Sequence, residues 1–222
     1  MSTLTVREQG TAERKRRVVE AALLLAAKGG YESVQMRGVA AAADVALGTI
    51  YRYFSSKDEL LLAGLAGWSK RTRRRLAEVD TSRLSAADRL GHAVQEAAKE
   101  GDRAPLLMKA FITAMASTDP AVSRYKLDIN RSISGIIRDA LGDDVSGIDV
   151  ASIEWMIGHV WFSATARWVS GMSKSGSVGL ELRRAVELLL PRDSQTVIDL
   201  HDSGSGLKSS KAAGAATAGL KR

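Results

Sequence analysis

The chain has 222 residues, with 32 Lys and Arg, 25 Asp and Glu, and no cysteine, which gives a net charge of +7. A chain of this length buries a core without covalent cross-links, and the absence of cysteine excludes disulfides, thiolate zinc sites and a cysteine nucleophile. No apolar run approaches the roughly 20 residues of a membrane span. We therefore expect a soluble cytoplasmic protein with no membrane partner.

The positive charge is concentrated in the N-terminal third of the chain. Residues 1–75 contain 14 Lys and Arg against 7 Asp and Glu, whereas residues 76–191 contain 13 against 15. A basic segment attracts polyanions because neutralising phosphates releases condensed counterions. The distribution indicates double-stranded DNA as a partner, and a merely solvated basic surface is the alternative.

Helical periodicity dominates the chain, and strand-like alternation is nearly absent. The expected fold class is therefore all-α. Thr11 is a candidate N-cap of the first helix, and Gly29-Gly30 is expected to end it. The expected helices cover residues 11–28, 34–42, 47–54, 56–79, 85–99, 104–117, 119–141, 149–173 and 177–190.

Composition and periodicity divide the chain into four segments. The C-terminal segment consists mainly of Asp, Ser, Gly, Lys and Ala, whose apolar area is too small to offset chain entropy. We expect a flexible N-terminal arm over residues 1–10, a helix-turn-helix domain over 11–55, a ligand-binding and dimerisation domain over 56–191 and a disordered tail over 192–222.

The helices expected over residues 34–42 and 47–54 are joined by only a short turn. They must cross closely, and Ala40 and Ala43 are small enough to permit this. Such a pair forms a helix-turn-helix, whose second helix enters the major groove of DNA. The buried wedge between the helices is expected to consist of Val39, Val45, Ile50 and Phe54.

The second of these helices has an inward and an outward face. Successive residues turn by about 100°, so Ile50 and Phe54 point inward together. The opposite face suits close approach to bases and phosphates, although the aromatic residues could equally be packing residues. Lys57, at the start of the next helix, is a candidate phosphate contact together with free backbone N–H groups. The outward face carries Gly48, Thr49 and Arg52, and Tyr51 and Tyr53 border it.

This segment resembles the signature of the tetracycline-repressor (TetR) family over about residues 12–65. The resemblance rests on Val39-Ala40, Ala43-Asp-Val-Ala46, Gly48-Thr-Ile-Tyr-Arg-Tyr-Phe54, Ser56-Lys57 and Leu60. It implies a three-helix DNA-binding domain, a helical ligand-binding and dimerisation domain, a homodimer and a near-palindromic operator. The positions that match the usual DNA contacts of the family are Arg37, Leu47, Gly48, Thr49, Tyr51, Tyr53 and Lys57.

Two positions depart from the family pattern. Ala46 stands where a Ser or Thr cap is common, and Asp44 stands where the turn commonly has Gly. We expect Asp44 to act as a substitute cap of the second helix.

A closer resemblance links the chain to the actinobacterial cholesterol-catabolism repressors (KstR). It rests on Lys28-Gly-Gly-Tyr-Glu32, Val34-Gln-Met-Arg37 and Ala43-Asp-Val-Ala46, with a weaker match at Val160-Trp161. This resemblance implies a similar operator and an effector that is a steroid or an acyl-CoA thioester.

The helix expected over residues 149–173 is apolar almost all round, so it should be buried on more than one side. With the last helix it is the candidate for a four-helix dimer interface, and ordinary core packing within the subunit is the alternative. The candidate interface residues are Trp161, Trp168, Val186 and Leu189.

A pocket for a small hydrophobic effector is expected between the middle helices. Two methionines at helical spacing can adapt to a ligand, and core packing is again the alternative for each residue. The candidate pocket residues are Met108, Phe111, Met115, Trp155, His159 and Phe162.

Two other functional classes explain the sequence less well. An enzyme is disfavoured because the three histidines accompany no nucleophile elbow, phosphate-binding loop or metal-ligand spacing, so we expect no catalytic residue, metal site or cofactor. A non-specific architectural DNA-binding protein would leave the apolar C-terminal domain unused. The sequence therefore favours a sequence-specific transcriptional regulator, a repressor that a small hydrophobic effector releases from its operator.

Overall fold

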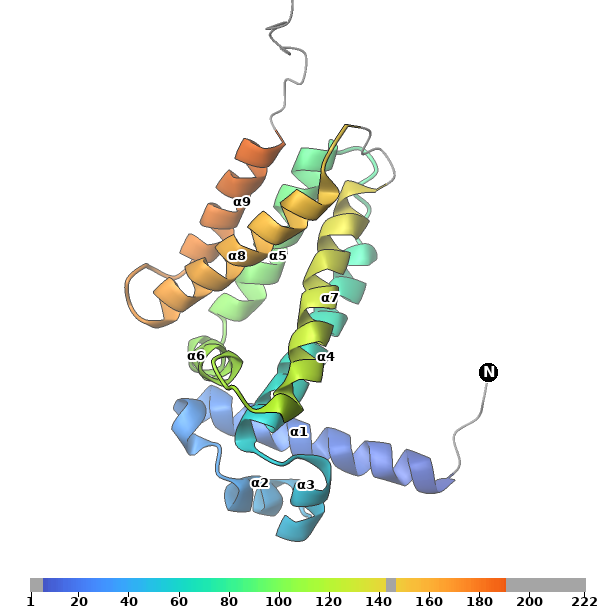
Figure 1. Ribbon diagram of the computed structural model, residues 1–222, viewed down its shortest axis with the longest axis vertical. Helices are drawn as coiled ribbons and strands as arrows, with labels where there is room; N and C mark the ends of the chain where they lie inside the picture. The colour runs from blue at the N-terminus through green and yellow to red at the C-terminus, as the bar shows by residue number, and fades with distance from the viewer. Residues whose placement is uncertain (1–5, 143–146, 191–222) are drawn as a thin grey trace, which may run out of the picture. The chain divides into compact units, whose positions relative to one another are not determined.

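The computed structural model describes residues 6–142 and 147–190, and every regular element within these ranges is helical (Figure 1). The predicted all-α fold is confirmed. The expected tail and residues 1–5 of the expected arm lie outside the described residues. The elements are α1 (Val6–Ser33), α2 (Met36–Ala43), α3 (Leu47–Tyr53), α4 (Lys57–Ala77), α5 (Ala86–Asp102), α6 (Pro105–Met115), the short 3-10 helix η1 (Pro120–Val122), α7 (Ser123–Leu141), α8 (Val150–Val169) and α9 (Ser177–Leu189).

The first helix begins earlier than predicted. α1 already includes Val6, so the assignment of Thr11 as its N-cap is wrong, and Thr11 lies more than one turn inside the helix. Exposed ion pairs join Arg16 to Glu13 and Glu20, which lie about one turn away in either direction. Pairs at this spacing each stabilise a helix by about 0.2–0.5 kcal/mol, and they support this projecting part of α1.

The predicted stop at Gly29-Gly30 is a break near the end of α1. Gly30 has φ +72° and ψ −164°, a backbone conformation that strains residues with a side chain. The Ser33 hydroxyl oxygen lies 2.6 Å from the carbonyl oxygen of Leu25 and 2.7 Å from that of Gly30. It thereby supplies a donor to the carbonyls of Leu25 and Gly30, before and at the break.

The N-terminal head, which consists of α1, α2 and α3, has three of the four predicted wedge residues at its centre, and the fourth, Val45, is half-buried against the core. Val39 of α2, Ile50 of α3 and Phe54 directly after α3 are completely buried. Ala40 and Ala43 are buried between them and allow α2 and α3 to cross closely.

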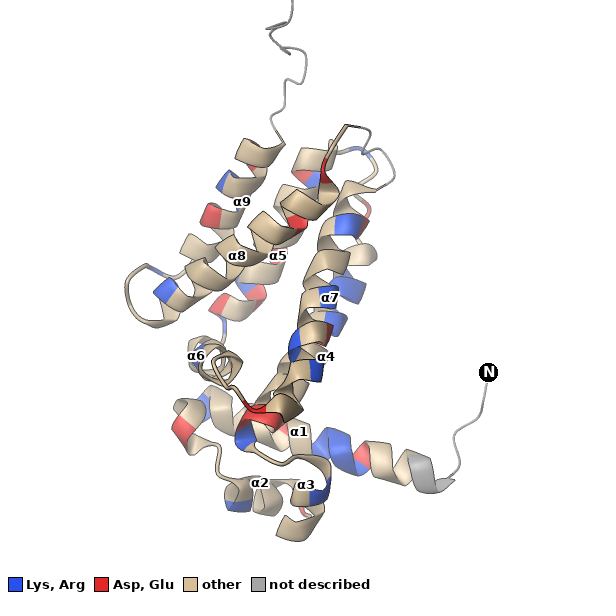
Figure 2. Ribbon diagram, in the orientation of Figure 1, with Lys and Arg blue, Asp and Glu red and all other residues tan. Residues whose placement is uncertain are grey.

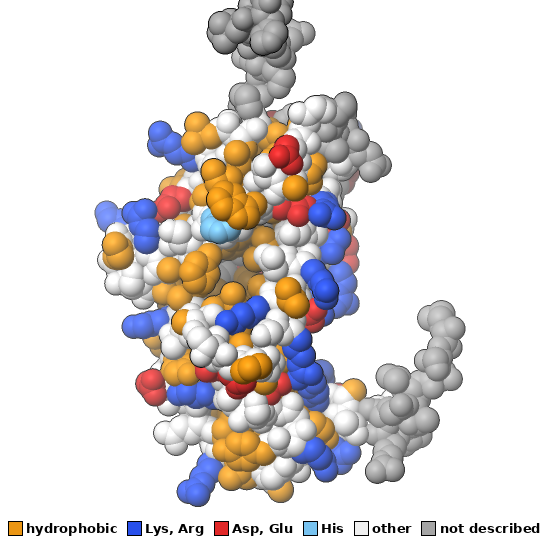
Figure 3. Space-filling model, in the orientation of Figure 1, with side chains coloured by type: hydrophobic (Ala, Val, Ile, Leu, Met, Phe, Trp, Pro, Cys, Tyr) orange, Lys and Arg blue, Asp and Glu red, His pale blue; other side chains and the backbone are white. Residues whose placement is uncertain are grey.

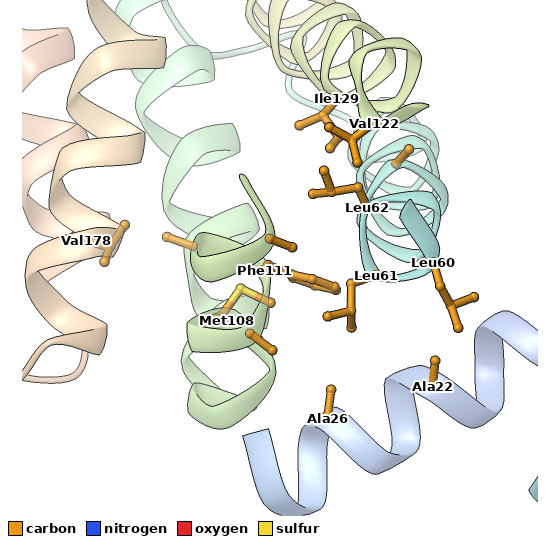
Figure 4. Close-up of a cluster of buried hydrophobic side chains, with 14 of the residues drawn as sticks. Ala22, Ala26, Leu60, Leu61, Leu62, Met108, Phe111, Val122, Ile129 and Val178 are labelled. Carbon is orange, nitrogen blue, oxygen red and sulfur yellow. The ribbon is translucent and has the colours of Figure 1, made fainter. Parts of the chain in front are cut away.

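α4 carries the chain from the head into the rest of the subunit. Its three consecutive leucines Leu60, Leu61 and Leu62 are all completely buried. At Gly64 a Cβ atom would lie 2.5 Å from Leu23 Cδ2 of α1, so the two helices approach too closely there for a side chain. Figure 4 shows the facing side chains of α1 and α6: Ala22, Ala26, Met108 and Phe111.

In the remainder of the subunit α4 packs against α7, and α9 packs against both α5 and α8 (Figure 1). Arg73 of α4 forms a two-pronged ion pair with Asp139 of α7, at 2.7 and 2.9 Å. Helices α1 to α9 lie in one compact unit. The predicted boundary after residue 55 therefore stays a prediction about which residues bind DNA and which bind an effector. Among the helices of the described ranges, none combines the length and apolarity that a membrane crossing requires.

Asp44 ends α2 and does not cap α3, which corrects the expectation from the sequence. It adopts the left-handed conformation, with φ 53° and ψ 57°, and its N–H donates to the Ala41 carbonyl at 3.3 Å. The N-cap of α3 is Ala46, which has no side-chain acceptor. Asp44 lies two residues before the N-cap, and its backbone serves as the left-handed C-cap of α2.

We expect Asp44→Gly to leave the free energy of unfolding unchanged or raise it, because glycine adopts the left-handed region without strain. Asp44→Val should lower it by about 1–2 kcal/mol, since a β-branched side chain is strained there. Urea unfolding followed by circular dichroism measures both, with Asp44→Asn as the matched control that tolerates this backbone. Equal stability of the Val and Asn variants would contradict the left-handed turn.

Candidate DNA interface and effector cavity

The reading helix α3 is held by its buried face and leaves the opposite face open. Ile50 anchors it to the core, whereas Gly48, Tyr51 and Arg52 are exposed. The other candidate DNA contacts on α3, Leu47, Thr49 and Tyr53, are half-buried at its edges. Ile50 and Phe54 thus form the predicted inward face, and of the predicted outward residues Gly48 and Arg52 are exposed whereas Thr49 is half-buried.

Gly48 is a glycine that the subunit itself does not require. A Cβ atom at this position would meet nothing within 4 Å, and its backbone is helical. A glycine inside a helix costs about 0.5–1 kcal/mol relative to alanine. The missing side chain at Gly48 therefore indicates that a binding partner outside the subunit approaches α3 closely.

Arg52 and Tyr53, at the end of α3, interact through their side chains. Arg52 donates a hydrogen bond to the Tyr53 hydroxyl at 3.2 Å, and its guanidinium carbon lies 5.1 Å from the centre of the Tyr53 ring. The hydrogen bond from Arg52 lowers the pKa of Tyr53 below its usual value. The guanidinium stays exposed, so it retains donors for a base or a phosphate.

Lys57 is held beside the head by an aromatic ring. Its ammonium lies 3.7 Å from the centre of the Tyr31 ring and 3.6 Å from the exposed carboxylate of Glu32. Tyr31 in turn donates to Asp58 at 2.5 Å, and burial raises the pKa of Tyr31 above its usual value. The pair with Glu32 is solvated on the Glu32 side, and such pairs add little stability. Lys57 is therefore positioned without being committed to this one partner.

The N-terminus of α4 is less available to a phosphate than the sequence suggested. The Ser56 hydroxyl accepts the Glu59 N–H at 3.1 Å, and Asp58 and Glu59 place two carboxylates in the first turn. These carboxylates already complement the positive end of the helix dipole. The Lys57 ammonium, rather than the backbone N–H groups, is thus the anion-binding feature of this region.

Basic residues are present on all three helices of the head (Figure 2). Arg37, in the first turn of α2, is exposed, as is Arg14 of α1. Together with Arg52 and Lys57 they provide positive charge around α3.

The sequence analysis missed Glu59, which ties the head to the first turn of α7. This carboxylate is buried, and one oxygen accepts from the Ser55 N–H at 2.7 Å and the Ser55 hydroxyl at 2.9 Å. Its other oxygen accepts from Arg124 of α7 at 2.6 Å. The Ser-x-x-Glu capping pattern of Ser56 to Glu59 could have singled out this carboxylate, but nothing local marked Arg124 as its partner.

A large cavity of about 840 Å³ lies among α4, α5, α6, α7 and α8. Its lining is mainly apolar, and Figure 3 shows one face of the protein hollowed between hydrophobic side chains. At its rim the His159 Nδ1–H donates to the Trp155 carbonyl at 2.7 Å, and the His159 ring lies tilted against the Trp155 ring with the ring centres 4.3 Å apart. All six residues predicted for an effector pocket line this cavity: Met108, Phe111, Met115, Trp155, His159 and Phe162.

The candidate dimer residues are not all at the surface. Trp168 and Val186 are only 9% and 1% exposed in the subunit, so their side chains have almost no area to lose to a partner. We therefore remove both residues from the candidate dimer surface and assign them to the buried core of the subunit. Trp161 is half-buried and lines the cavity, and Leu189 is half-buried on α9.

Other apolar residues on α8 and α9 are exposed instead. Leu180 and Leu188 of α9 are 67% and 77% exposed, and Met156 of α8 is also exposed. An apolar all-round helix such as α8 offers no sequence signal that separates these positions from the buried ones.

Two family models match the chain. The bacterial regulatory proteins of the tetR family match residues 18–63, and the tetracycline-repressor-like C-terminal domain matches residues 84–189.

Relatives of known function span most of the chain. The HTH-type transcriptional repressor KstR of Mycolicibacterium smegmatis is 33% identical over 189 residues, which cover 84% of this chain and 91% of that protein. KstR of Rhodococcus jostii is 34% identical over 178 residues, which cover 80% and 83%. The closer resemblance noted from the sequence is thereby confirmed.

Solved structures share the fold. A TetR transcriptional regulator from Rhodococcus sp. RHA1 is 27% identical with a TM-score of 0.73, and the match covers 82% of this chain and 98% of that one. FadR of Thermus thermophilus in complex with lauroyl-CoA is 18% identical with a TM-score of 0.63, and covers 90% and 100%. Both the head and the cavity-bearing part of this chain thus have counterparts in regulators, which leaves the architectural alternative without support. The chain belongs to the TetR family of bacterial transcriptional regulators.

Proposed function

We propose that the protein is a cytoplasmic homodimeric repressor that binds a near-palindromic operator and releases it when a small hydrophobic effector fills the cavity. The observation that carries the proposal is the double role of α4. Its first residue, Lys57, lies beside the head, while Leu65, Trp68 and Ser69 further along the same helix line the cavity. A single helix therefore contacts both the DNA-binding head and the effector cavity. The proposed function includes no catalytic activity.

The DNA interface proposed here is the exposed face of α3 with its basic surroundings. The hydroxyl of Thr49, the phenol of Tyr51 and the guanidinium of Arg52 suit base edges and phosphates. Leu47, Gly48 and Tyr53 complete the face on α3. Arg37 and Lys57 would contact the phosphates on either side.

The proposed dimer surface is formed by α8 and α9. Leu180 and Leu188 are exposed on α9 and Met156 on the adjacent α8, and exposed apolar groups of this kind mark interfaces. Leu189 and Trp161 lie at its edge. A dimer presents two reading helices at a fixed separation, as a near-palindromic operator requires.

The effector is proposed to be a steroid or an acyl-CoA thioester. The cavity volume of about 840 Å³ and its apolar lining fit a molecule with a large hydrocarbon body. The relatives support this chemistry, since they include repressors named KstR and a FadR structure with bound lauroyl-CoA.

Release is proposed to pass through the contact between Glu59 and Arg124. Ser123 and Lys126, on either side of Arg124, line the cavity, while Glu59 holds Ser55 at the end of the reading helix. An effector that binds better to a conformation with a displaced α7 would shift the population toward misplaced heads.

Operator preference tests the function directly. We expect the dimer to bind the intergenic DNA beside its own gene about 1,000-fold more tightly than scrambled DNA at physiological salt. A steroid or an acyl-CoA should weaken the specific binding, as measured by fluorescence anisotropy. Equal affinity for the two DNAs contradicts a sequence-specific regulator, and an unresponsive complex contradicts the effector class.

Gly48→Ala should separate stability from DNA binding. The change should raise the free energy of unfolding by up to about 1 kcal/mol, because alanine is the better helix former. It should weaken operator binding about ten-fold, comparable with the loss of one base-pair contact, because the added methyl group obstructs close approach. Gly67→Ala in α4 is the control for a helix-stabilising change away from α3, and undiminished operator binding by Gly48→Ala would refute the reading face.

Arg124→Gln should reduce the coupling between effector and DNA. The factor by which the effector weakens operator binding should fall about five-fold, on the order of 1 kcal/mol of coupling, while effector affinity without DNA stays unchanged. Titrations of both ligands, singly and together, give this factor. Arg131→Gln is the matched control, because Arg131 is an exposed arginine of the same helix that pairs only with Asp128. A coupling factor that Arg124→Gln leaves at the wild-type value would exclude this route.

A further inference from the structure

The innermost wall of the cavity carries two buried hydroxyl groups on α4. Ser69 and Thr72 line the cavity and are only 5% and 3% exposed. Three residues apart on a helix, they lie on the same face. The cavity also has a solvent-exposed part, because Leu127 and Trp155 in its lining are exposed. A ligand therefore has one buried end, near these hydroxyls, and one end near solvent.

The protons of both hydroxyls are already committed to the protein. Ser69 donates to the Ala66 carbonyl at 3.0 Å, and Thr72 donates to the Glu100 carboxylate at 2.6 Å. The other oxygen of Glu100 pairs with Arg75 at 2.6 Å. A carbonyl and a carboxylate can only accept, so Ser69 and Thr72 must be the donors in these bonds.

What remains at each hydroxyl is a pair of acceptor sites. A hydroxyl has one proton and two lone pairs, and the proton is used. Toward the cavity, these two hydroxyl groups can therefore act only as acceptors. The cationic Lys126, by contrast, lies in the first turns of α7, near the exposed Leu127.

We propose that this buried wall selects effectors whose inner end carries a hydroxyl group, over effectors that end in a ketone or a hydrocarbon. The proposal rests on the effector-responsive function proposed above and specifies the chemistry of that effector. A hydroxyl group donates to Thr72 or Ser69 without disturbing the protein. A ketone oxygen beside these hydroxyls would face acceptors, unless Thr72 turned away from Glu100 and left this half-buried carboxylate short of a donor.

A hydrocarbon end is disfavoured for a different reason. It would exclude water from the free lone pairs of Ser69 and Thr72 without offering a hydrogen bond in return. The polar wall thus sets the end group, while the apolar remainder of the lining accepts the body of the ligand.

Matched pairs of ligands test the proposal on the intact dimer. The first pair is cholestanol and cholestanone, and the second is ω-hydroxypalmitoyl-CoA and palmitoyl-CoA. Binding is followed by tryptophan fluorescence, because all four tryptophans of the chain line the cavity. In at least one pair we expect the hydroxyl compound to bind about ten-fold more tightly, the effect of one well-placed hydrogen bond and one avoided mismatch.

Variants of Thr72 assign the preference to the wall. Thr72→Val should bring the ratio of affinities toward one, whereas Thr72→Ser should retain it. Thr113→Val removes an exposed hydroxyl on α6 that does not line the cavity and should leave the ratio unchanged. The comparison of ligand pairs on the wild-type protein does not depend on whether any variant folds.

Each result has a distinct meaning. Equal binding of both members of each pair, together with release of DNA, overturns the hydroxyl preference and leaves the effector-responsive repressor intact. A preference that survives in Thr72→Val also overturns it, because another group would then be the acceptor. Failure of all four compounds to bind overturns both the preference and the proposed effector class.

Discussion

Three consecutive leucines of α4, Leu60 to Leu62, are completely buried. Successive helical side chains diverge by about 100°, so α4 has no solvent-facing side at this level and is enclosed by neighbours, α1 and α6 among them (Figure 4). Close packing of this kind does not deform gradually, because interiors are as dense as crystals. The head cannot tilt on its own here. Any displacement of α4 must be shared with α1 below it and with the cavity wall above it.

Glu59 adds specific hydrogen bonds to this apolar packing, through its contacts with Ser55 and Arg124. A buried carboxylate needs partners, since an unpaired buried charge is strongly destabilising. Glu59 finds its partners on two sides, at the end of the reading helix and at the start of α7. Apolar contacts join the head to the cavity-bearing helices. The Glu59 carboxylate holds one particular position of the head, Ser55, against one particular position of α7, Arg124.

Much of the reading head could be predicted because its information is local. The wedge of Val39, Ile50 and Phe54 follows from helical spacing, and the six cavity residues follow from apolar periodicity with adaptable methionines. The role of Asp44 could not be predicted, because the turn is so short that a shift of one or two residues decides whether Asp44 ends α2 or caps α3. Trp168 was misplaced because α8 is apolar on nearly every side, so that periodicity gives no direction. The bond between Glu59 and Arg124 joins residues 65 positions apart, and no local pattern encodes it.

The division of labour along α4 also bears on how such regulators diversify. Its first turn holds the head, and its middle turns, at Trp68, Ser69 and Thr72, line the cavity without touching α3. Substitutions in the middle turns can therefore alter ligand preference while the operator-reading surface stays the same. Gene duplication followed by changes at these few positions would produce regulators that share an operator and respond to different metabolites.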